Sequence, residues 1–310
     1  MSLYENKYFM LLHGKFRKSF PSVFSFLRSA KRKSRNIFRN YLSTESVLSK
    51  EDLIQDLIEA GITNDDLLMV HSSLRKIGKI ENGANTLIEA LLHCIGTNGT
   101  LAMPSFPIRE DAATTIQKGN FTFDQLNTPS QMGMVTEIFR KMPGVKRSFH
   151  PTHPVCARGP LADHLTNSHF GELTPFSENS PFRKLCNQNG KILLIGVTMN
   201  QSLTNLHTLE DIKEFNLPVY LNTTYEVKMI DDNGNAHIMK TKVHDPTVSS
   251  TRDCDALKPI FIKENVLKEI QIGKAKCIVL DAYKLHQVMV DAYLANKVTM
   301  YHPLGIDSQA

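Results

Sequence analysis

Residues 66–106 read DLLMVHSSLRKIGKIENGANTLIEALLHCIGTNGTLAMPSF, and this stretch decides the fold class. The apolar run at 66–74 has the length of a buried strand. Residues 85–96 place apolar side chains on one face of a helix that Gly96 ends. A second apolar run at 99–106 predicts another strand. Strand, helix and strand in that order predict a βαβ unit and therefore an α/β fold around a mostly parallel sheet.

The same rules extend the prediction in both directions along the chain. Ser49 precedes the segment EDLIQDLIEAGI, so a capped helix is expected over 43–62 with Gly61 at its end. Residues 190–199, GKILLIGVTM, have the pattern of a further buried strand. The other expectations are a polar loop at 107–131, helices over 132–142 and 203–215, a hairpin within 219–245 around the Asn-Gly pair 233–234, and a helix–strand–helix order over 263–297.

Size and composition limit the class of protein. The chain has 310 residues, of which 41% are hydrophobic and 22% charged, which suits one large domain with a real core. No apolar stretch approaches the length of a membrane-spanning helix. Five cysteines stand far apart without a C-x-x-C pair, which argues against a disulfide framework or a zinc ribbon and favours the reducing cytosol.

The charge is unevenly distributed along the chain. Residues 1–44 contain ten Lys or Arg and the single acid Glu5, whereas the rest carries 26 basic and 30 acidic residues. We therefore divide the chain into a basic, Phe-containing extension, 1–44, and a near-neutral domain, 45–310. The extension is interpreted in three ways: a segment packed on the body or merely solvated, a segment bound to an anionic membrane surface, or a nucleic-acid arm, which is the least favoured. A secretory signal is not expected because no apolar region of the right length is present.

Histidines and serines follow the predicted strands, where α/β sheets bind ligands. His71 ends one strand beside two serines, and His207 begins the segment after another. His150 and His153 lie in the sequence HPTHP, whose prolines remove the helical geometry that would aim both at one metal, so no metal site is expected. The sequence lacks G-x-S-x-G, the P-loop motif and G-x-G-x-x-G, which argues against a serine hydrolase and against P-loop or Rossmann chemistry.

Four blocks in chain order carry a resemblance to a known family. They are VHSSLRKIGKIENGANTLIEALLHCIGTNGTLAMPSF (70–106), RSFHPTHPVCARGP (147–160), SPFRKLCNQNGKILLIGV (180–197) and TNLHTLED (204–211). Together they resemble the aminoglycoside 3-N-acetyltransferase family, the antibiotic N-acetyltransferase fold that is distinct from the GNAT fold. The resemblance covers roughly residues 50–300 and excludes the extension.

The resemblance implies direct acetyl transfer from acetyl-CoA, the expected cosubstrate, to an amino group of a sugar. His207 matches the family's catalytic histidine, and the Thr204 hydroxyl is a candidate donor to the thioester oxyanion. The resemblance further implies substrate-binding roles for His150 and His153. It implies contacts to the cofactor from two blocks, which contribute His71, Ser72, Ser73, Leu74, Met103, Pro104, Ser105 and Phe106.

The chain departs from the family where a glutamate would orient the histidine. The corresponding segment reads MKTKVHDP (239–246), in which Asp245 is expected to take that role and His244 is the other polar candidate. Glu210 keeps the acid of the family's helix and is a further catalytic candidate, with a structural cap as the alternative. Loss of acidic residues weakens a site for polycationic antibiotics. A biosynthetic, nucleotide- or lipid-linked amino sugar is therefore the favoured acceptor.

The rival hypothesis is a catalytically inactive, membrane-associated scaffold of a glycan-assembly complex. It would rest on the basic extension rather than on His207. The sequence leaves the oligomeric state open, and no nucleic-acid partner is expected. A cytoplasmic protein, with peripheral attachment to the inner face of the membrane as an option, is the expected location.

Overall fold

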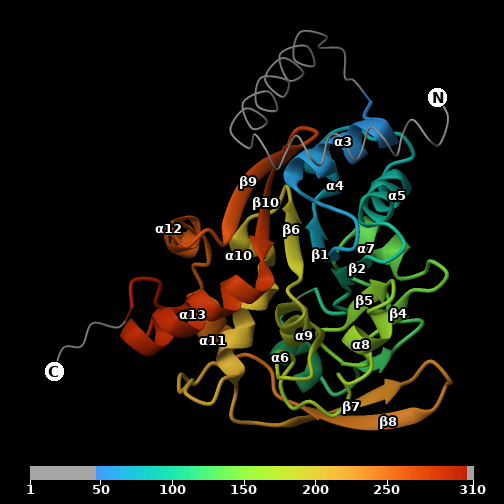
Figure 1. Ribbon diagram of the computed structural model, residues 1–310. Helices are drawn as coiled ribbons and strands as arrows, with labels where there is room; N and C mark the ends of the chain where they lie inside the picture. The colour runs from blue at the N-terminus through green and yellow to red at the C-terminus, as the bar shows by residue number, and fades with distance from the viewer. Residues whose placement is uncertain (1–46, 110, 306–310) are drawn as a thin grey trace. The chain divides into compact units, whose positions relative to one another are not determined.

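The computed structural model describes residues 47–109 and 111–305 (Figure 1). The chain divides into one unit up to Val47 and a second from Leu48 onward, and all the described helices and strands belong to the second unit. The extension 1–44 lies outside the described residues, so its interpretations stay predictions. Among the described helices, none has the length and apolar character needed to cross a bilayer.

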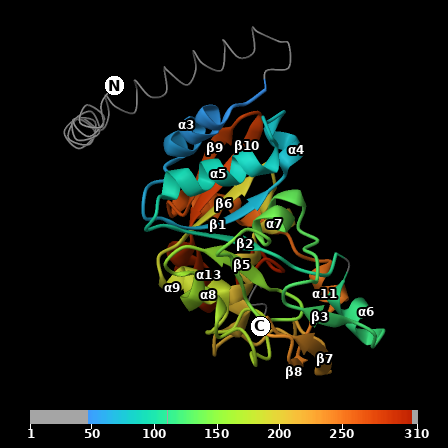
Figure 2. The same cartoon turned by 90° about the vertical axis from the view of Figure 1, so that its right-hand side faces the viewer.

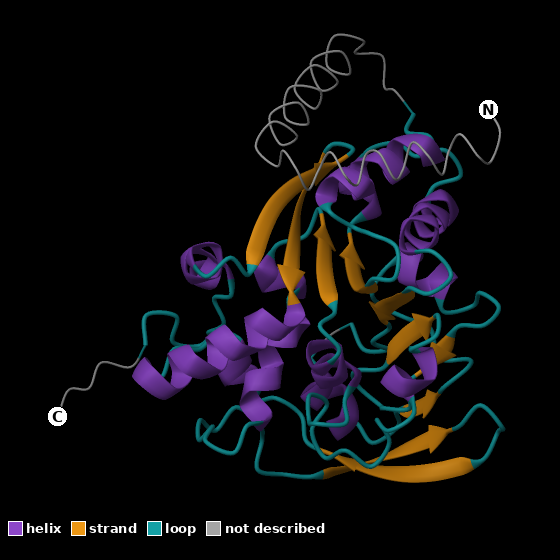
Figure 3. Cartoon of the chain, viewed as in Figure 1, coloured by secondary structure: helices purple, strands orange, loops and turns teal. Residues whose placement is uncertain are grey.

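A seven-stranded sheet forms the centre of this unit, in the order β4-β5-β2-β1-β6-β10-β9 (Figure 3). The three central strands β2, β1 and β6 are parallel, and the two strands on either side pair antiparallel. The parallel register runs from Leu68 opposite Leu101 to Ser72 opposite Ile195. The strands are β1 (Leu67–Ser72), β2 (Thr100–Pro104), β4 (Lys146–Arg147), β5 (Val155–Arg158), β6 (Lys191–Ile195), β9 (Leu267–Ile272) and β10 (Ala275–Asp281).

Helices cover both faces of the sheet, as buried parallel strands require (Figures 1 and 2). Along β1, Leu67 and Met69 enter one core, while Leu68 and Val70 enter the other. The first core is closed by α9 (Pro181–Asn187), the 3₁₀ helix η1 (Thr204–Asp211) and α13 (Ala282–Asn296). The second core is closed by α3 (Lys50–Ala60), α5 (Ala84–Ile95) and α7 (Met134–Phe139).

The first predicted helix is confirmed down to the residues that cap its two ends. Ser49 caps α3 with a capping box in which Asp52 returns the hydrogen bond, and Gly61 ends the helix with φ +96°. The helix expected over 43–62 thus begins at Lys50, and residues 43–46 lie outside the described part. The strand predictions at 66–74, 99–106 and 190–199 correspond to β1, β2 and β6.

The polar segment 107–131 is more ordered than expected. It contains α6 (Ala112–Gln117), which Asp111 caps, and β3 (Thr122–Asp124). The strand joins the hairpin β7 (Tyr225–Ile230) and β8 (Ala236–Thr241) in a second, three-stranded sheet. The turn of that hairpin is the predicted Asn-Gly pair, where Gly234 has φ +83°. The segment was expected to be a loop because its pairing partner β7 lies a hundred residues away, beyond the reach of local pattern.

Short elements complete the described chain. The helix expected over 203–215 is the shorter 3₁₀ helix η1, and the segment 263–297 contains two strands, β9 and β10, before α13. The remaining helices are α4 (Leu74–Ile77), α8 (Ala162–Thr166), α10 (Met199–Ser202), α11 (Pro246–Ser249), η2 (Asp255–Leu257) and α12 (Lys258–Lys263). All five cysteines are free and buried, as expected for a chain without a disulfide framework.

Candidate active site

The loop after β6 places His207 and Glu210 together. Gly196 turns the chain with φ +66°, Thr198 begins α10 with a capping box to Gln201, and η1 follows directly. A 3₁₀ helix has three residues per turn, so side chains at i and i+3 eclipse one another. His207 Nδ1 consequently lies 2.8 Å from Glu210 Oε1.

The Glu210 carboxylate is the centre of a buried hydrogen-bonded cluster. Besides His207 Nδ1, it accepts hydrogen bonds from His244 Nε2 at 2.7 Å, Tyr301 Oη at 2.6 Å and Tyr220 Oη at 3.1 Å. Burial alone would raise the pKa of Glu210, but the two histidines and their hydrogen bonds hold it well below its ordinary value. The group is therefore an ionised carboxylate with two hydrogen bonds on each oxygen.

This arrangement fixes the tautomer of His207. A carboxylate only accepts hydrogen bonds, so Nδ1 carries the proton and Nε2 carries the lone pair. Burial lowers the pKa of His207 to about 4, an effect that Glu210 partly opposes, and the ring is neutral at physiological pH. The ring of Phe176 stacks on the imidazole with centroids 4.6 Å apart. His207 thus offers a fixed, neutral acceptor atom.

A cavity of about 290 Å³ opens in front of His207, and we call it the His207 pocket. Its lining includes helix α10, Leu203, Ser249 and Cys254. The predicted residues that line it are Phe106, His153, Thr204 and His207. The carboxyl ends of β2 and β6 and the start of β5 supply these side chains, which is the edge of the sheet where ligands were expected.

The structure corrects the prediction for Asp245. Its carboxylate caps α11 and accepts hydrogen bonds from the Thr247 N–H at 2.8 Å and the Thr247 hydroxyl at 2.7 Å, and it makes no hydrogen bond to His207. Its neighbour His244 joins the cluster instead, and Glu210 orients the histidine. The orienting role was predicted for an acid far along the chain, whereas the 3₁₀ helix brings the nearby Glu210 into contact with His207.

His150 requires a second correction. Its side chain is fully buried, stacks on His169 with centroids 4.4 Å apart, and does not line the His207 pocket. The next histidine of the motif, His153, does line it, and its Nδ1 lies 2.8 Å from the Thr152 hydroxyl. Of the two predicted substrate contacts, only His153 stays a candidate.

The cofactor blocks divide in the same way. Met103 packs in the core beneath α5, and Ser105 is fully buried with its hydroxyl accepting from Arg147 Nε at 2.8 Å. Both side chains are buried against the protein itself, so neither is kept as a candidate contact to the cofactor. In the other block, His71 Nε2 is buried without a hydrogen-bond partner in the described structure, and burial lowers its pKa to about 3. The remaining predicted contacts are Ser72 at the end of β1, Ser73 before α4, Leu74 within α4, and Pro104 and Phe106 at the end of β2.

Four residues of the site were not singled out from sequence: Phe176, Tyr220, Arg252 and Tyr301. Arg252 matters most, because its Nη1 lies 3.0 Å from His207 Nε2 and its chain lines the pocket. These residues come from loops spread over more than a hundred positions, and no local motif marks them. Only the three-dimensional fold shows that these side chains meet at Glu210 and His207.

The cluster of His207, Glu210 and His244 has the composition of a metal site, with its ligand atoms within 4.8 Å of one another. A metal ligand needs a free lone pair. His207 Nδ1 and His244 Nε2 both donate to Glu210, and two tyrosines occupy the remaining positions on the carboxylate. The donor set therefore fits an orienting cluster better than a metal.

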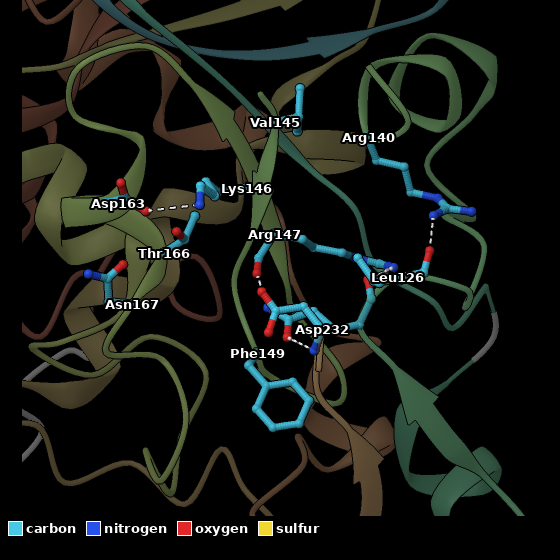
Figure 4. Close-up of a pocket in the computed structure, with 11 residues that line it drawn as sticks. Leu126, Arg140, Val145, Lys146, Arg147, Phe149, Asp163, Thr166, Asn167 and Asp232 are labelled. Carbon is cyan, nitrogen blue, oxygen red and sulfur yellow. Dashed lines mark hydrogen bonds and ion pairs between the residues drawn. The ribbon is translucent and has the colours of Figure 1, made fainter. Parts of the chain in front are cut away.

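A second cavity, of about 310 Å³, lies beside β4, and we call it the Arg147 pocket (Figure 4). Its cations are already engaged by the protein. Arg147 donates to the Ser105 carbonyl oxygen at 2.7 Å and to that of Thr128 at 2.6 Å, and Lys146 lies 3.7 Å from Asp163. Its lining residues include no histidine, so it has no imidazole acceptor like His207 Nε2.

Comparison with known proteins defines the class as an N-acetyltransferase of α/β fold. The family model described as aminoglycoside 3-N-acetyltransferase matches residues 69–293. The chain belongs to this family, which confirms the resemblance found in the sequence and the prediction of an acetyltransferase enzyme.

Individual relatives agree with that assignment. Aminoglycoside N(3)-acetyltransferase III of Salmonella sp is 30% identical over 256 residues, which cover 76% of this chain and 87% of the relative. The crystal structure of YokD from Bacillus subtilis superposes with a TM-score of 0.69 at 25% identity, over 82% of this chain and 96% of that one. AAC-IIIb in a binary complex with CoASH gives 0.67 at 22% identity, over 79% and 96%. The predicted fold class is confirmed.

Proposed function

We propose that this chain transfers the acetyl group of acetyl-CoA to an amino group of an amino sugar, with His207 as the general base. The observation that carries the proposal is the hydrogen bond from His207 Nδ1 to Glu210, which leaves Nε2 as the acceptor atom of a residue that lines a cavity. Acetyl-CoA is the cosubstrate, in line with the family and with the CoASH complex of AAC-IIIb.

The reaction needs one proton transfer and one acyl transfer. The acceptor amine attacks the thioester carbonyl, the new C–N bond forms, and the amine proton passes to His207 Nε2. The C–S bond then breaks, and the thiolate of CoA takes up the proton, which leaves an amide and free CoA. Glu210 stabilises the imidazolium that exists in between, and such general-base help is worth about 10²–10⁴-fold.

Positioning supplies the other part of the rate. Thr204 Oγ1 lines the pocket and lies 3.4 Å from the Ser202 carbonyl oxygen, a weak bond that it can exchange for the thioester oxygen. We assign His153 to the acceptor, and Ser72, Ser73 and Leu74 to CoA. The unpartnered Nε2 of His71 supports a polar ligand at this end of β1.

Two classes of amine are candidate acceptors. The relatives are named for aminoglycosides, and an aminoglycoside is one candidate acceptor for this chain. A nucleotide- or lipid-linked amino sugar is the other, because no acidic side chain lines the His207 pocket among the described residues. The assembled His207 cluster speaks against the inactive scaffold considered from sequence.

A screen for thiol release from acetyl-CoA tests the activity. We expect release with at least one amino sugar or aminoglycoside, and none with the matching N-acetylated compound. Acetyl-CoA should also raise the melting temperature, since a ligand at 100 times its Kd adds about 2.7 kcal/mol to the unfolding free energy. A melting shift without turnover on any amine would favour the scaffold, and absence of both results would refute the proposal.

We also propose that residues 1–44 attach the protein to anionic membrane surfaces while 45–310 performs the chemistry. The support is the excess of ten bases over one acid, interspersed with phenylalanine. A chain starting at Ser43 should keep its turnover and lose salt-sensitive binding to phosphatidylserine vesicles. Equal vesicle binding by the two chains would contradict this assignment.

A further inference from the structure

Arg252 occupies the atom that the proposed mechanism uses. Its Nη1 donates to His207 Nε2 at 3.0 Å, and its Nε donates to the Ser249 carbonyl oxygen at 2.9 Å. In this position the guanidinium covers the lone pair that must receive the amine proton. Its positive charge also disfavours a second cation on His207. Turnover therefore requires Arg252 to leave the histidine.

The surroundings of Arg252 leave its charge uncompensated. It is exposed, makes no ion pair within the described residues, and its Nη2 has no hydrogen bond there. The two nearest acids in the chain point elsewhere: Asp253 accepts from the Ala256 N–H at 3.1 Å, and Asp255 accepts from the Met199 N–H at 3.0 Å. The only charged side chain among the described lining residues is thus a cation with free N–H groups.

The free N–H groups of Arg252 are suited to a phosphate, which a guanidinium binds through two parallel hydrogen bonds. The same group repels the several ammonium groups of a polycationic acceptor. An anion that holds Arg252 would at the same time uncover His207 Nε2 and remove a neighbouring positive charge from the base. Binding of the right acceptor and release of the base would then be one event.

We propose that Arg252 is the acceptor-selecting residue: it binds a phosphate group of the amino sugar and thereby frees His207 for proton transfer. This inference rests on the proposed function, because it concerns the acceptor of that reaction. It predicts a phosphorylated or nucleotide-linked amino sugar as the acceptor class. A phosphate of CoA is the other chemical source, and the experiment separates the two.

The kinetic arm compares glucosamine 6-phosphate, glucosamine and sisomicin as acceptors by thiol release. The wild type should prefer the phosphorylated sugar in kcat/KM, and Arg252→Gln should reduce that preference by about 10- to 100-fold, the worth of a charge-assisted hydrogen bond. Arg252→Lys should retain part of it. Lys146→Gln, which removes a cation from the Arg147 pocket, is the matched control and should keep the full preference.

A second arm does not depend on turnover. In ¹⁵N-histidine NMR spectra, with His207→Gln used for assignment, glucosamine 6-phosphate should shift the Nε2 resonance of His207 in the wild type but not in Arg252→Gln. Glucosamine should have no such effect. If the phosphorylated sugar leaves this resonance unmoved in the wild type, the inference is wrong, whatever the enzyme acetylates. If turnover is absent but the shift occurs, the proposed function fails and the inference about Arg252 stands.

The remaining outcome concerns the cosubstrate. If Arg252→Gln loses the melting shift with acetyl-CoA while its preference among acceptors is unchanged, Arg252 binds a phosphate of CoA. That result would also overturn the inference.

Discussion

The His207 pocket and the Arg147 pocket are nearly equal in size, about 290 and 310 Å³, yet they use arginine in opposite ways. Arg147 is buried, and carbonyl oxygens and a hydroxyl of its own fold receive its donors. Arg252 is exposed, and one of its N–H groups donates to the lone pair of His207 Nε2. The first arginine stabilises structure, and the second is free to exchange partners.

The difference shows that volume does not identify a site. What distinguishes the His207 pocket is its set of lining polar groups: an imidazole, a threonine hydroxyl and a guanidinium whose charge no acid of the described residues pairs. In the Arg147 pocket the guanidinium instead donates its hydrogen bonds to carbonyl oxygens of the surrounding protein. Four predictions test this distinction, in order of decreasing effect.

His207→Ala should reduce kcat by about 10²–10⁴-fold, because the general base is lost. The melting shift with acetyl-CoA should persist, since His207 acts on the amine. Lys146→Ala in the Arg147 pocket is the control and should change kcat less than twofold, by roughly the scatter of neutral surface changes. An unchanged kcat in His207→Ala would erase the distinction between the two cavities.

Glu210→Gln should lower kcat by about 10²-fold, because the amide cannot stabilise the imidazolium and its NH₂ group faces donors. Asp245→Asn is the matched control, with the same loss of charge in a helix cap 35 positions further along, and should retain near-normal kcat. A large loss in Asp245→Asn with little in Glu210→Gln would restore the prediction made from sequence. Steady-state kinetics and circular dichroism of both variants decide the matter.

Arg147→Leu should destabilise the protein by roughly 3 kcal/mol, since it strands the carbonyl oxygens of Ser105 and Thr128. That corresponds to a melting temperature about 6–12 °C lower. Lys146→Leu, at an exposed position of the same pocket, should stay within about 0.5 kcal/mol. Loss of acetylation at an unchanged melting temperature would instead make the Arg147 pocket a functional site.

The smallest effect concerns pH. Burial lowers the pKa of His207 to about 4 in the native state, against about 6.5 in the unfolded chain. Between these values the unfolded state binds a proton that the native state does not, so stability falls as the pH drops from 6.5 toward 4. The slope per histidine is at most about 1.4 kcal/mol per pH unit.

His207→Gln should therefore flatten the dependence of the unfolding free energy on pH in that window. Lys146→Gln should leave it unchanged, because this substitution touches neither His207 nor the residues hydrogen-bonded to it. The comparison is made by urea denaturation at pH 5 and pH 7. An equal slope in wild type and His207→Gln would show that His207 is not neutral and buried in solution.

The sequence predicted those parts of the molecule that local pattern encodes. The capped helix at Ser49, the strands β1, β2 and β6, and the Asn-Gly hairpin all follow from residues close together in the chain. The family resemblance was likewise readable, because motifs are local. β3 and the antiparallel strand β9 were missed, since their partners decide their conformation.

The site followed the same division. Thr204, His153 and Phe106 reach the pocket as expected, whereas Asp245 and His150 do not. A helix with 3.6 residues per turn would have separated His207 from Glu210 more than η1 does, and the predicted α-helix over 203–215 concealed their pairing. Tyr301 and Arg252 reach the cluster only through tertiary structure.

The five cysteines of the enzyme are buried and therefore react slowly with thiol reagents. Burial raises the pKa of Cys94, Cys156, Cys186 and Cys277 to about 11 and that of Cys254 to about 12, so almost no thiolate is present at assay pH. A thiol reagent added during turnover should thus react with released CoA before it reacts with the protein, in which Cys254 is the one of the five that lines the His207 pocket. The slow reaction of the protein's own thiols with the reagent, followed without substrate, then measures how often the core opens.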